Sequence, residues 1–316
     1  MNIDYKDYPV IPCPLCISKE FRTICFRFDS GRIVKCSGCG HIYLNPALPD
    51  RILVDIYEQY YSDDSYMETL EQWFTGPQSN YQYALHFIEQ KGGFLGKRVL
   101  DVGCGPGRFL HECQKKGAFV TGIEISPKAV HKAKEYFNLD LIPKSFERAI
   151  IDKDVSSSSF DFIFAFEVIE HVKDPGIFLQ ALYNLLVPNG LVFISTPNFY
   201  QFYLMGKSAG AVNSCSEHLH FFDSASLTKC LERHNFMVKD IFTFPASTYG
   251  VRQKQKLIKT PLALNIWKKI RFISLVRHFK NTVFCMLDRY KERADIEQES
   301  GDCLIAVAQR QMDKEI

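Results

Sequence analysis

The chain has 316 residues, of which 46% are hydrophobic and 23% are charged, and its formal net charge is +2. This composition fits one large domain with an appendage, or two small domains, and excludes a wholly disordered chain. The near-neutral charge gives no overall preference for nucleic acid, which is therefore not an expected partner.

The chain contains eleven cysteines, an odd number. Its first residues show no basic start followed by an apolar run, which predicts that no signal peptide is present. Reduced thiols in a cytoplasmic protein therefore explain the cysteines better than a disulfide framework does. No stretch approaches eighteen uninterrupted apolar residues, so no transmembrane helix is expected.

Residues 1–45 are predicted to form a small zinc ribbon. Two C-x2-C pairs are separated by nineteen residues, and strand-like runs at 23–28 and 32–35 supply a hairpin between them. Because four thiolates leave no open coordination position, the predicted zinc is structural. A redox C-x-x-C is the alternative, but it usually lies in a βαβ unit that this segment lacks. The four ligands are Cys13, Cys16, Cys36 and Cys39.

Residues 46–95, rich in aromatic and acidic side chains, are predicted to form a helical linker that acts as a lid. Residues 96–316 alternate short apolar strands with amphipathic helices, which is typical of an α/β domain whose parallel sheet carries helices on both faces. The predicted strands are 98–102, 119–124, 139–143, 160–166, 191–195, 237–244 and 303–309, and the predicted helices are 108–116, 127–137 and 175–186.

A glycine-rich turn, VLDVGCGPG at 99–107, joins the first of these strands to a helix. Such a turn lets the backbone approach a ligand closely, and the helix start offers free N–H groups. Its spacing is G-x-G-x-G, not the G-x-G-x-x-G of a pyrophosphate site. The second strand ends at Glu124, where a carboxylate can accept hydrogen bonds from two ribose hydroxyls. The alternative is a structural turn beside an incidental acid.

The sequence resembles the class I S-adenosylmethionine-dependent methyltransferases over about residues 97–245. The resemblance rests on five motifs, which are VLDVGCGPG (99–107), TGIEIS (121–126), SFDFIFAFEVIEHVKDP (159–175), LLVPNGLVFISTPN (185–198) and EHLHFFD (217–223). It implies a Rossmann-like sheet of seven strands whose last pair is antiparallel. It further implies that S-adenosylmethionine is bound by Asp101, Gly103, Gly105, Gly107 and Glu124, with Phe166 and Glu167 over the cofactor near the substrate opening.

A cysteine ribbon before such a domain, the aromatic run QYYSDDSY at 59–66 and a later Glu-His pair are similar to deoxysugar C-methyltransferases and their relatives. That likeness nominates Glu217 and His218 as catalytic residues. A neutral histidine is a suitable general base at cellular pH, and a neighbouring carboxylate can orient it. The alternative is that this segment only caps and buries a loop beside the sheet.

Alternatively, residues of the same region could bind a second, divalent metal ion. Glu167, Glu170 and His171 lie at i, i+3 and i+4, on one face of a helical turn, and His218 or His220 could join them as ligands. This arrangement resembles small-RNA 2′-O-methyltransferases and, in part, some quinone O-methyltransferases.

The domain carries a predicted basic insertion at about 250–295. Between Arg252 and Arg293 there are twelve Lys or Arg residues and two acids, interleaved with apolar residues at helical spacing. Residues 252–293 could therefore contact an anionic membrane surface peripherally. The alternative is a helical lid with solvated lysines.

These patterns together predict an S-adenosylmethionine-dependent methyltransferase that acts on a small-molecule acceptor, namely a sugar, a glycan precursor or a lipid-linked metabolite. It would be cytoplasmic, alternatively peripheral to the inner membrane surface. A metal-assisted O-methyltransferase acting on RNA or on a catechol or quinone is the competing enzyme. A zinc-ribbon binding protein with a degenerate methyltransferase domain is the competitor from another class.

Overall fold

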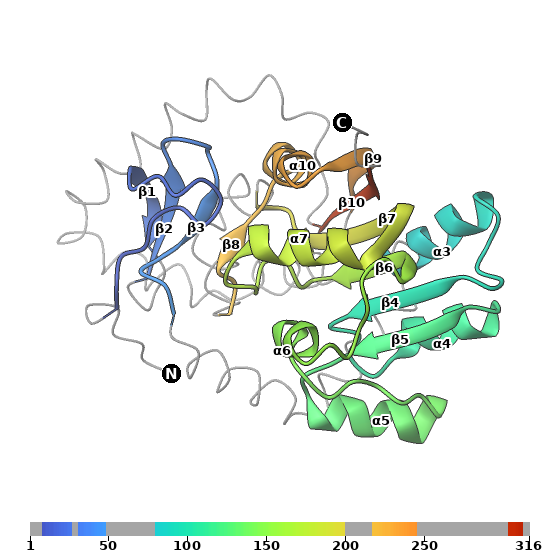
Figure 1. The fold of residues 1–316 in the computed structure, drawn as a ribbon. Helices are drawn as coiled ribbons and strands as arrows, with labels where there is room; N and C mark the ends of the chain where they lie inside the picture. The colour runs from blue at the N-terminus through green and yellow to red at the C-terminus, as the bar shows by residue number, and fades with distance from the viewer. Residues whose placement is uncertain (1–7, 27–30, 49–79, 200–216, 245–302, 312–316) are drawn as a thin grey trace, which may run out of the picture.

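The computed structural model describes residues 8–26, 31–48, 80–199, 217–244 and 303–311. These residues form two β-sheets (Figure 1). A small sheet near the N-terminus has the strand order β1-β2-β3-β8, and a larger one has the order β5-β4-β6-β7-β10-β9.

The larger sheet is mixed, as the sequence predicts. Its first four strands pair in parallel, whereas β10 pairs antiparallel with both β7 and β9. The strands are β4 (Arg98–Val102), β5 (Phe119–Ile123), β6 (Phe160–Phe166), β7 (Leu186–Pro197), β9 (Phe236–Phe244) and β10 (Cys303–Arg310).

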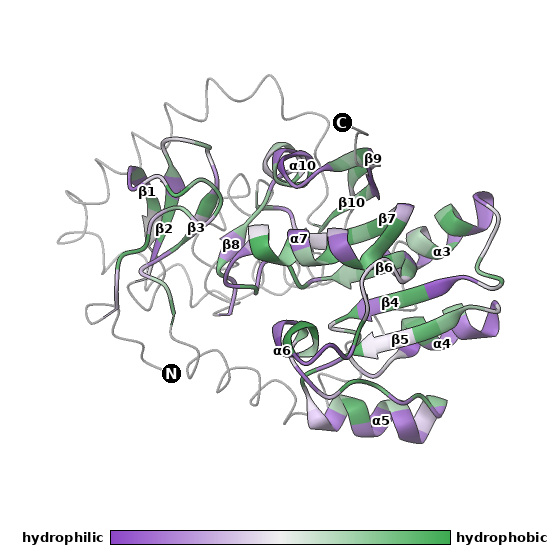
Figure 2. Ribbon diagram, in the orientation of Figure 1, coloured by the Kyte–Doolittle hydropathy of each residue, from purple (hydrophilic) through white to green (hydrophobic). Residues whose placement is uncertain are grey.

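Helices cover both faces of this sheet, and each face has its own apolar core. On one face α3 (Asn80–Gln90), α4 (Arg108–Lys115) and α5 (Pro127–Phe137) pack over Val99, Phe164 and Phe193. On the other face lie α6 (Phe146–Ile151), α7 (Pro175–Leu185) and α10 (Ser224–Arg233), over Leu100, Ile163 and Ile194. Figure 2 shows the strands as largely apolar and the helices as two-sided, as burial between layers requires.

Local sequence signals fix where several helices begin. Asp174 caps α7 by accepting hydrogen bonds from the N–H groups of Gly176 and Ile177, and Pro175 follows at the first helical position. The sequence did not predict α10, although Asp223 and Ser226 form a reciprocal capping box at its start.

One of the seven predicted strands, 139–143, is reduced to one β-bridge between Ile142 and Ile123. Ile142 makes both ladder bonds, since its N–H donates to Gly122 O and its carbonyl accepts from Glu124 N. The next N–H that could bond to β5 is that of Lys144, but it donates back to Ile142 O at 2.9 Å, so the chain turns and pairing stops there. Among the described residues the larger sheet therefore has six strands.

The small sheet consists of β1 (Phe21–Phe26), β2 (Arg32–Cys36), β3 (Ile42–Asn45) and β8 (His220–Phe221), all paired antiparallel. The predicted hairpin is present, with its first strand shifted to begin two residues earlier. The sequence predicted neither β3 nor β8. Because β8 comes from the methyltransferase region, the N-terminal sheet is completed by a segment that follows it by about 175 residues.

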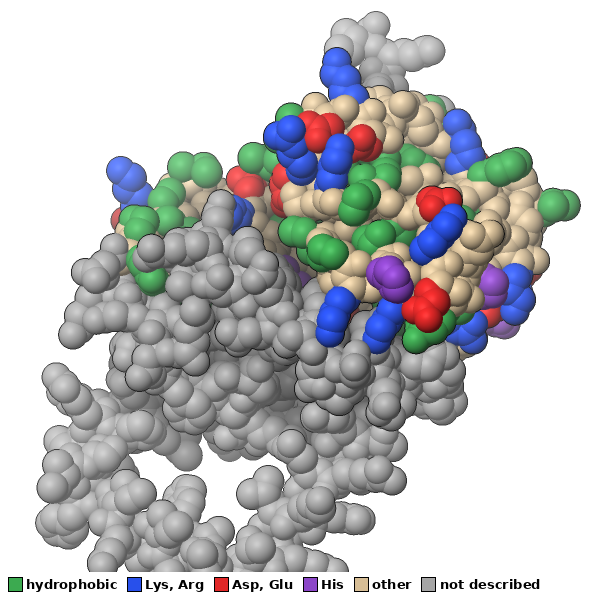
Figure 3. Space-filling model, turned by 90° about the horizontal axis from the view of Figure 1, so that it is seen from below, with side chains coloured by type: hydrophobic (Ala, Val, Ile, Leu, Met, Phe, Trp, Pro, Cys, Tyr) green, Lys and Arg blue, Asp and Glu red, His purple; other side chains and the backbone are tan. Residues whose placement is uncertain are grey.

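Within the part of the chain that the structure describes, no helix has the length and apolar character needed to cross a membrane. On the face shown in Figure 3, basic and acidic side chains are interspersed. The basic insertion at 252–293 and the aromatic run at 59–66 lie outside the described residues.

Candidate active site

The predicted cofactor residues meet at the carboxyl edge of the parallel strands. Asp101 lies in β4 beside Gly122 of β5 and Phe164 of β6, and Glu124 directly follows β5. Both carboxyl groups are buried, with Asp101 3% and Glu124 2% exposed. In open α/β sheets, ligands bind at this edge of the strands.

The glycine-rich turn adopts backbone angles that only glycine tolerates well. Gly103, Gly105 and Gly107 have φ values of 68°, 54° and 78°. A Cβ atom would lie 2.8 Å from Val168 at Gly103 and 2.9 Å from Leu139 at Gly107. The turn therefore needs these glycines for its shape, and α4 begins immediately after it.

Glu124 holds the turn from the neighbouring strand. Its Oε2 accepts a hydrogen bond from Gly105 N at 2.9 Å, and its Oε1 accepts one from Ser126 N at 2.8 Å. A carboxylate offers about four lone-pair sites, so it can accept hydrogen bonds from ribose hydroxyls as well as from these backbone donors. These residues thus fit S-adenosylmethionine, with a rigid acceptor for the ribose and an acid for the cationic end.

The pKa of Asp101 is raised well above its ordinary value by burial and, second, by the negative charge of Glu124. Without cofactor, Asp101 therefore keeps its proton at pH values where an exposed carboxyl has lost it. The sulfonium and ammonium groups of S-adenosylmethionine favour the carboxylate form, so cofactor binding should release a proton.

We expect cofactor affinity to rise with pH through the range below the raised pKa of Asp101 and to level off above it. Calorimetric titrations in two buffers of different ionisation enthalpy measure the released proton. Asp101→Asn should abolish the release. Equal proton release in this variant and the wild type would contradict the assignment.

Phe166 and Glu167 are the residues predicted to lie over the cofactor. Phe166 is the last residue of β6, and Glu167 follows it in a different environment. The Phe166 ring is buried and packs against Tyr81 and Phe109, with ring centroids 4.9 Å and 5.4 Å away. Glu167 adopts the left-handed region with a φ of 56°, which is uncommon outside glycine and clusters at functional sites.

Two residues that the sequence did not predict, Ser195 and Cys303, contact Glu167, and a third, Asn80, holds Ser195. Ser195 Oγ donates to Glu167 Oε1 at 2.7 Å, and Cys303 Sγ lies 3.5 Å from the same oxygen. Asn80 Nδ2 donates to Ser195 Oγ at 2.8 Å. Of these three residues, only Ser195 could have been suspected from the sequence. It ends the apolar run LVFIS, where a buried hydroxyl needs a hydrogen-bond partner.

Glu217 and His218 are brought to the loop that follows β6. The N–H groups of Leu219 and His220 donate to Glu170 O at 2.8 Å and 3.1 Å. His218 Nε2 lies 4.0 Å from Glu217 Oε1, and the His218 ring packs edge-on to His171 at 4.8 Å between centroids. The two nominated catalytic residues therefore share the edge of the sheet that carries Asp101 and Glu124.

His218 also belongs to a cluster of one carboxyl and two imidazoles. Glu170, His171 and His218 each offer one ligand atom, and these atoms lie within 4.8 Å of one another. Glu170 is 1% exposed, and neither of its oxygens has a hydrogen-bond partner among the described residues. Burial raises the pKa of Glu170 well above its ordinary value and lowers that of His171 to about 4. Glu167 is not in the set.

The four ribbon cysteines converge as predicted. Their sulfurs lie within 4.8 Å of one another, and the closest pairs are Cys13–Cys39 at 3.5 Å and Cys16–Cys36 at 3.4 Å. A tetrahedral zinc with Zn–S bonds of about 2.3 Å needs sulfurs about 3.8 Å apart. Gly38 N also points at Cys36 Sγ, 3.3 Å away, as a donor to a thiolate would. The donor set thus fits zinc.

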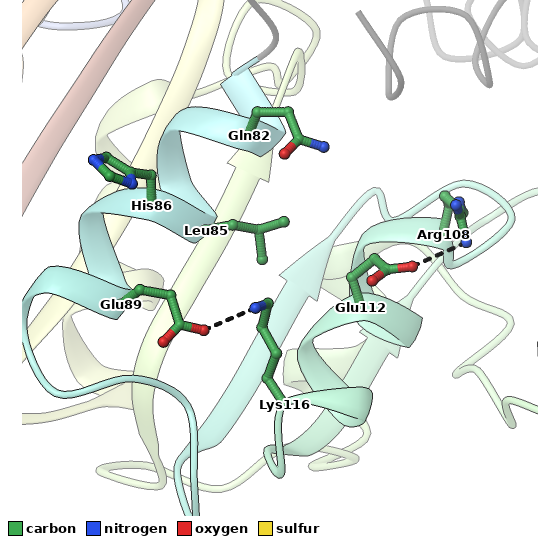
Figure 4. Close-up of a pocket in the computed structure, with 7 residues that line it drawn as sticks. All are labelled: Gln82, Leu85, His86, Glu89, Arg108, Glu112 and Lys116. Carbon is green, nitrogen blue, oxygen red and sulfur yellow. Dashed lines mark hydrogen bonds and ion pairs between the residues drawn. The ribbon is translucent and has the colours of Figure 1, made fainter. Parts of the chain in front are cut away.

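A surface hollow of about 560 Å³ lies apart from these residues, between α3 and α4 (Figure 4). Its charged side chains pair with one another, Glu89 with Lys116 at 2.9 Å and Arg108 with Glu112 at 3.1 Å. Its lining includes neither the predicted cofactor acids nor the nominated catalytic pair, so it is not the candidate active site. Its lining residues are Gln82, Leu85, His86, Glu89, Arg108, Glu112 and Lys116.

The fold and this edge of the sheet define the class of S-adenosylmethionine-dependent methyltransferases. A family model described as a methyltransferase domain matches residues 76–240, and the chain belongs to that family.

Two curated relatives are ubiquinone biosynthesis O-methyltransferases. The protein of Aeromonas salmonicida (strain A449) is 28% identical over 162 residues, which cover 48% of this chain and 68% of the relative. That of Neisseria meningitidis serogroup C (strain 053442) is 36% identical over 118 residues, which cover 36% of this chain and 50% of the relative. The matches thus span 68% and 50% of the length of these two relatives.

A solved structure shares the fold. It belongs to the complex between the Haloferax volcanii Trm112 methyltransferase activator and a methyltransferase. The matched chain is 16% identical with a TM-score of 0.52, and the match covers 83% of this chain and 99% of that one.

Proposed function

We propose that this protein transfers the methyl group of S-adenosylmethionine to a hydroxyl of a small-molecule acceptor, with His218 as the general base and Glu217 as the group that orients it. The observation that carries the proposal is the placement of this pair against the loop after β6, which begins at Glu167, one of the predicted cofactor residues. Both curated relatives are ubiquinone biosynthesis O-methyltransferases, which supports a small-molecule oxygen acceptor.

The chemistry asks little of the protein beyond alignment and proton removal. The sulfonium of S-adenosylmethionine is already a good leaving group, so the site must hold the acceptor oxygen in line and take its proton. A neutral imidazole accepts that proton, and a carboxylate next to it stabilises the imidazolium that forms. The structural zinc would hold the ribbon and take no part in these steps.

Substituting His218 with asparagine should lower kcat by about 10² to 10⁴-fold, because the acceptor proton loses its base. Affinity for S-adenosylmethionine should stay unchanged. Formation of S-adenosylhomocysteine measures the rate, with a catechol acid and a nucleotide-linked deoxysugar as acceptor probes. His131→Asn, at an exposed position on α5, is the matched control. Full activity of the His218 variant would refute the proposed base.

A second candidate is a metal-assisted O-methyltransferase acting on a catechol or quinone. It is favoured by the convergence of Glu170, His171 and His218 and by the unpartnered carboxyl of Glu170, which a cation would satisfy. A divalent ion there would lower the pKa of an acceptor hydroxyl. The same assay separates the two mechanisms, because a chelator that leaves the ribbon zinc in place should stop only the metal-assisted reaction.

The class of acceptor stays a prediction, whether sugar, glycan precursor, lipid-linked metabolite or aromatic ring. Peripheral membrane contact through residues 252–293 also stays a prediction. Liposome sedimentation, compared between wild type and a variant in which Lys268, Lys269 and Arg271 are neutralised, tests that contact.

A further inference from the structure

The N-terminal sheet and the candidate catalytic pair are joined by one short strand. β8 begins two residues after His218 and pairs with β3, with Ile42 opposite Phe221 and Tyr43 opposite His220. Leu44 N also donates to Leu219 O at 2.8 Å. The backbone that follows His218 is therefore an edge strand of the ribbon.

The opposite side of this backbone is held by the methyltransferase domain. Leu219 N and His220 N both donate to Glu170 O, and His171 Nδ1 lies 3.4 Å from Glu217 O. Segment 217–221 is thus clamped between the ribbon and the loop after β6. A shift of the ribbon would move the clamped segment, and His218 with it.

A chain of two buried imidazoles crosses the same junction. His220 Nε2 lies 2.8 Å from Val172 O, and His220 Nδ1 lies 3.0 Å from His41 Nε2. A carbonyl oxygen can only accept, so His220 must carry its proton on Nε2. A neutral imidazole has one N–H, which leaves His220 Nδ1 as an acceptor, and His41 Nε2 must then be the donor.

We propose that His41 is a positioning residue for the methyl-transfer reaction, acting from the ribbon through His220 on the segment that carries Glu217 and His218. The catalytic role of Glu217 and His218 rests on the proposed function. The connection between His41 and their segment rests on the hydrogen bonds described above. His41 is 1% exposed, and its ring lies 5.2 Å from that of His220 and 5.1 Å from that of Phe222. The ribbon is then a part of the active-site scaffold.

The direction of these hydrogen bonds explains why histidine is needed at position 41. Phenylalanine would keep a ring against Phe222 but would leave His220 Nδ1 buried without a donor, which destabilises the junction. Glutamine places an N–H near the position of histidine Nε2 and can restore the donor. His41→Phe and His41→Gln therefore separate the hydrogen bond from the packing.

The test compares both variants with the wild type in the full-length, zinc-loaded protein. Amide hydrogen exchange of segment 217–222 should accelerate about tenfold in His41→Phe and return to near the wild-type rate in His41→Gln. Nitrogen-15 spectra of labelled histidine should show His220 as the Nε2–H tautomer in the wild type. In His41→Phe its Nδ1 resonance should shift, because the donor is lost.

A matched control loosens the packing of the ribbon but leaves both hydrogen bonds of the imidazole chain in place. Val34→Ala removes two methyl groups beside the cysteine cluster and should leave exchange in segment 217–222 unchanged. The proposal is overturned if His41→Phe leaves exchange at the wild-type rate, if His41→Gln behaves like His41→Phe, or if Val34→Ala accelerates exchange equally.

Activity provides a separate measure. With an acceptor probe that supports turnover, His41→Phe should lower kcat by about 10 to 100-fold at unchanged affinity for S-adenosylmethionine. The cofactor residues belong to the other sheet and do not contact His41. If the wild type binds cofactor but methylates no probe, the proposed function fails, whereas the exchange and nitrogen-15 measurements still decide the connection between His41 and segment 217–221.

Discussion

Replacing Cys36 with serine is expected to reduce bound zinc from about one ion per chain to a small fraction of that and to unfold the N-terminal ribbon. The residue supplies one of four sulfurs that lie within 4.8 Å of one another, and its own sulfur lies next to the N–H of Gly38. Structural zinc contributes about 10–16 kcal/mol in comparable small domains, and three thiolates hold it much less tightly. Metal analysis of purified protein, with circular dichroism, measures both effects.

Among the described residues, the apolar core of the ribbon itself is small. Its apolar contacts form two small clusters, one around the cysteines with Val34 and Tyr43 and one around Ile33 and Leu44. A domain of this size seldom folds on such a core without a metal. Cys113→Ala is the matched control, because Cys113 is also buried but lies in α4 of the other domain. Zinc content equal to the wild type in Cys36→Ser would refute the site.

The same substitution should separate two properties of the enzyme. Methyl transfer should fall, because segment 217–221 loses its pairing with β3. Cofactor binding should survive, because Gly103, Gly105 and Glu124 are held by the larger sheet. An apoprotein that binds cofactor but transfers no methyl group is thus the expected state.

Sequence patterns predicted the parts of this fold that are encoded locally. The run VLDV with its glycine turn and the run FDFIFAF form β4 and β6 at the predicted residues. β7 was predicted from residue 191 but begins at Leu186, because the Pro188-Asn189-Gly190 break forms an irregularity within the strand and does not precede it. The structure also explains why glycine occupies position 122, since a Cβ there would lie 2.6 Å from Leu110 and from Leu141.

The contacts that assemble the site depend on residues far apart in the chain, and periodicity carries no information about them. β8 has only two residues, too few for a strand pattern, and its partner β3 lies about 175 residues earlier. His41 and His220 are 179 residues apart. Likewise, no local pattern predicts that Asn80 bonds to Ser195 or that Cys303 contacts Glu167, because α3 and β10 lie far from these residues in the chain.

Replacing Glu124 with glutamine is expected to weaken S-adenosylmethionine binding by about 100-fold or more. The carboxylate accepts hydrogen bonds from Gly105 N and Ser126 N, so both of its oxygens are fixed toward backbone donors. Glutamine keeps one acceptor oxygen and turns an NH₂ toward the other N–H, which leaves a buried donor unpaired at about 1–3 kcal/mol. It also removes one of the two acceptors that fit the ribose hydroxyls.

Two effects of this substitution must be told apart, because Glu124 both supports the turn and faces the predicted ribose. Calorimetric titration well below the melting temperature measures affinity, and thermal unfolding without cofactor measures stability. Adenosine, which has the ribose but no methionine, should lose affinity in Glu124→Gln by a factor similar to that for S-adenosylmethionine. Glu135→Gln, on the exposed face of α5, should bind cofactor within about twofold of the wild type. Unchanged affinity of Glu124→Gln for both ligands would show that the ribose lies elsewhere. Lost affinity for S-adenosylmethionine alone would mean that Glu124 acts through the glycine turn at the methionine end.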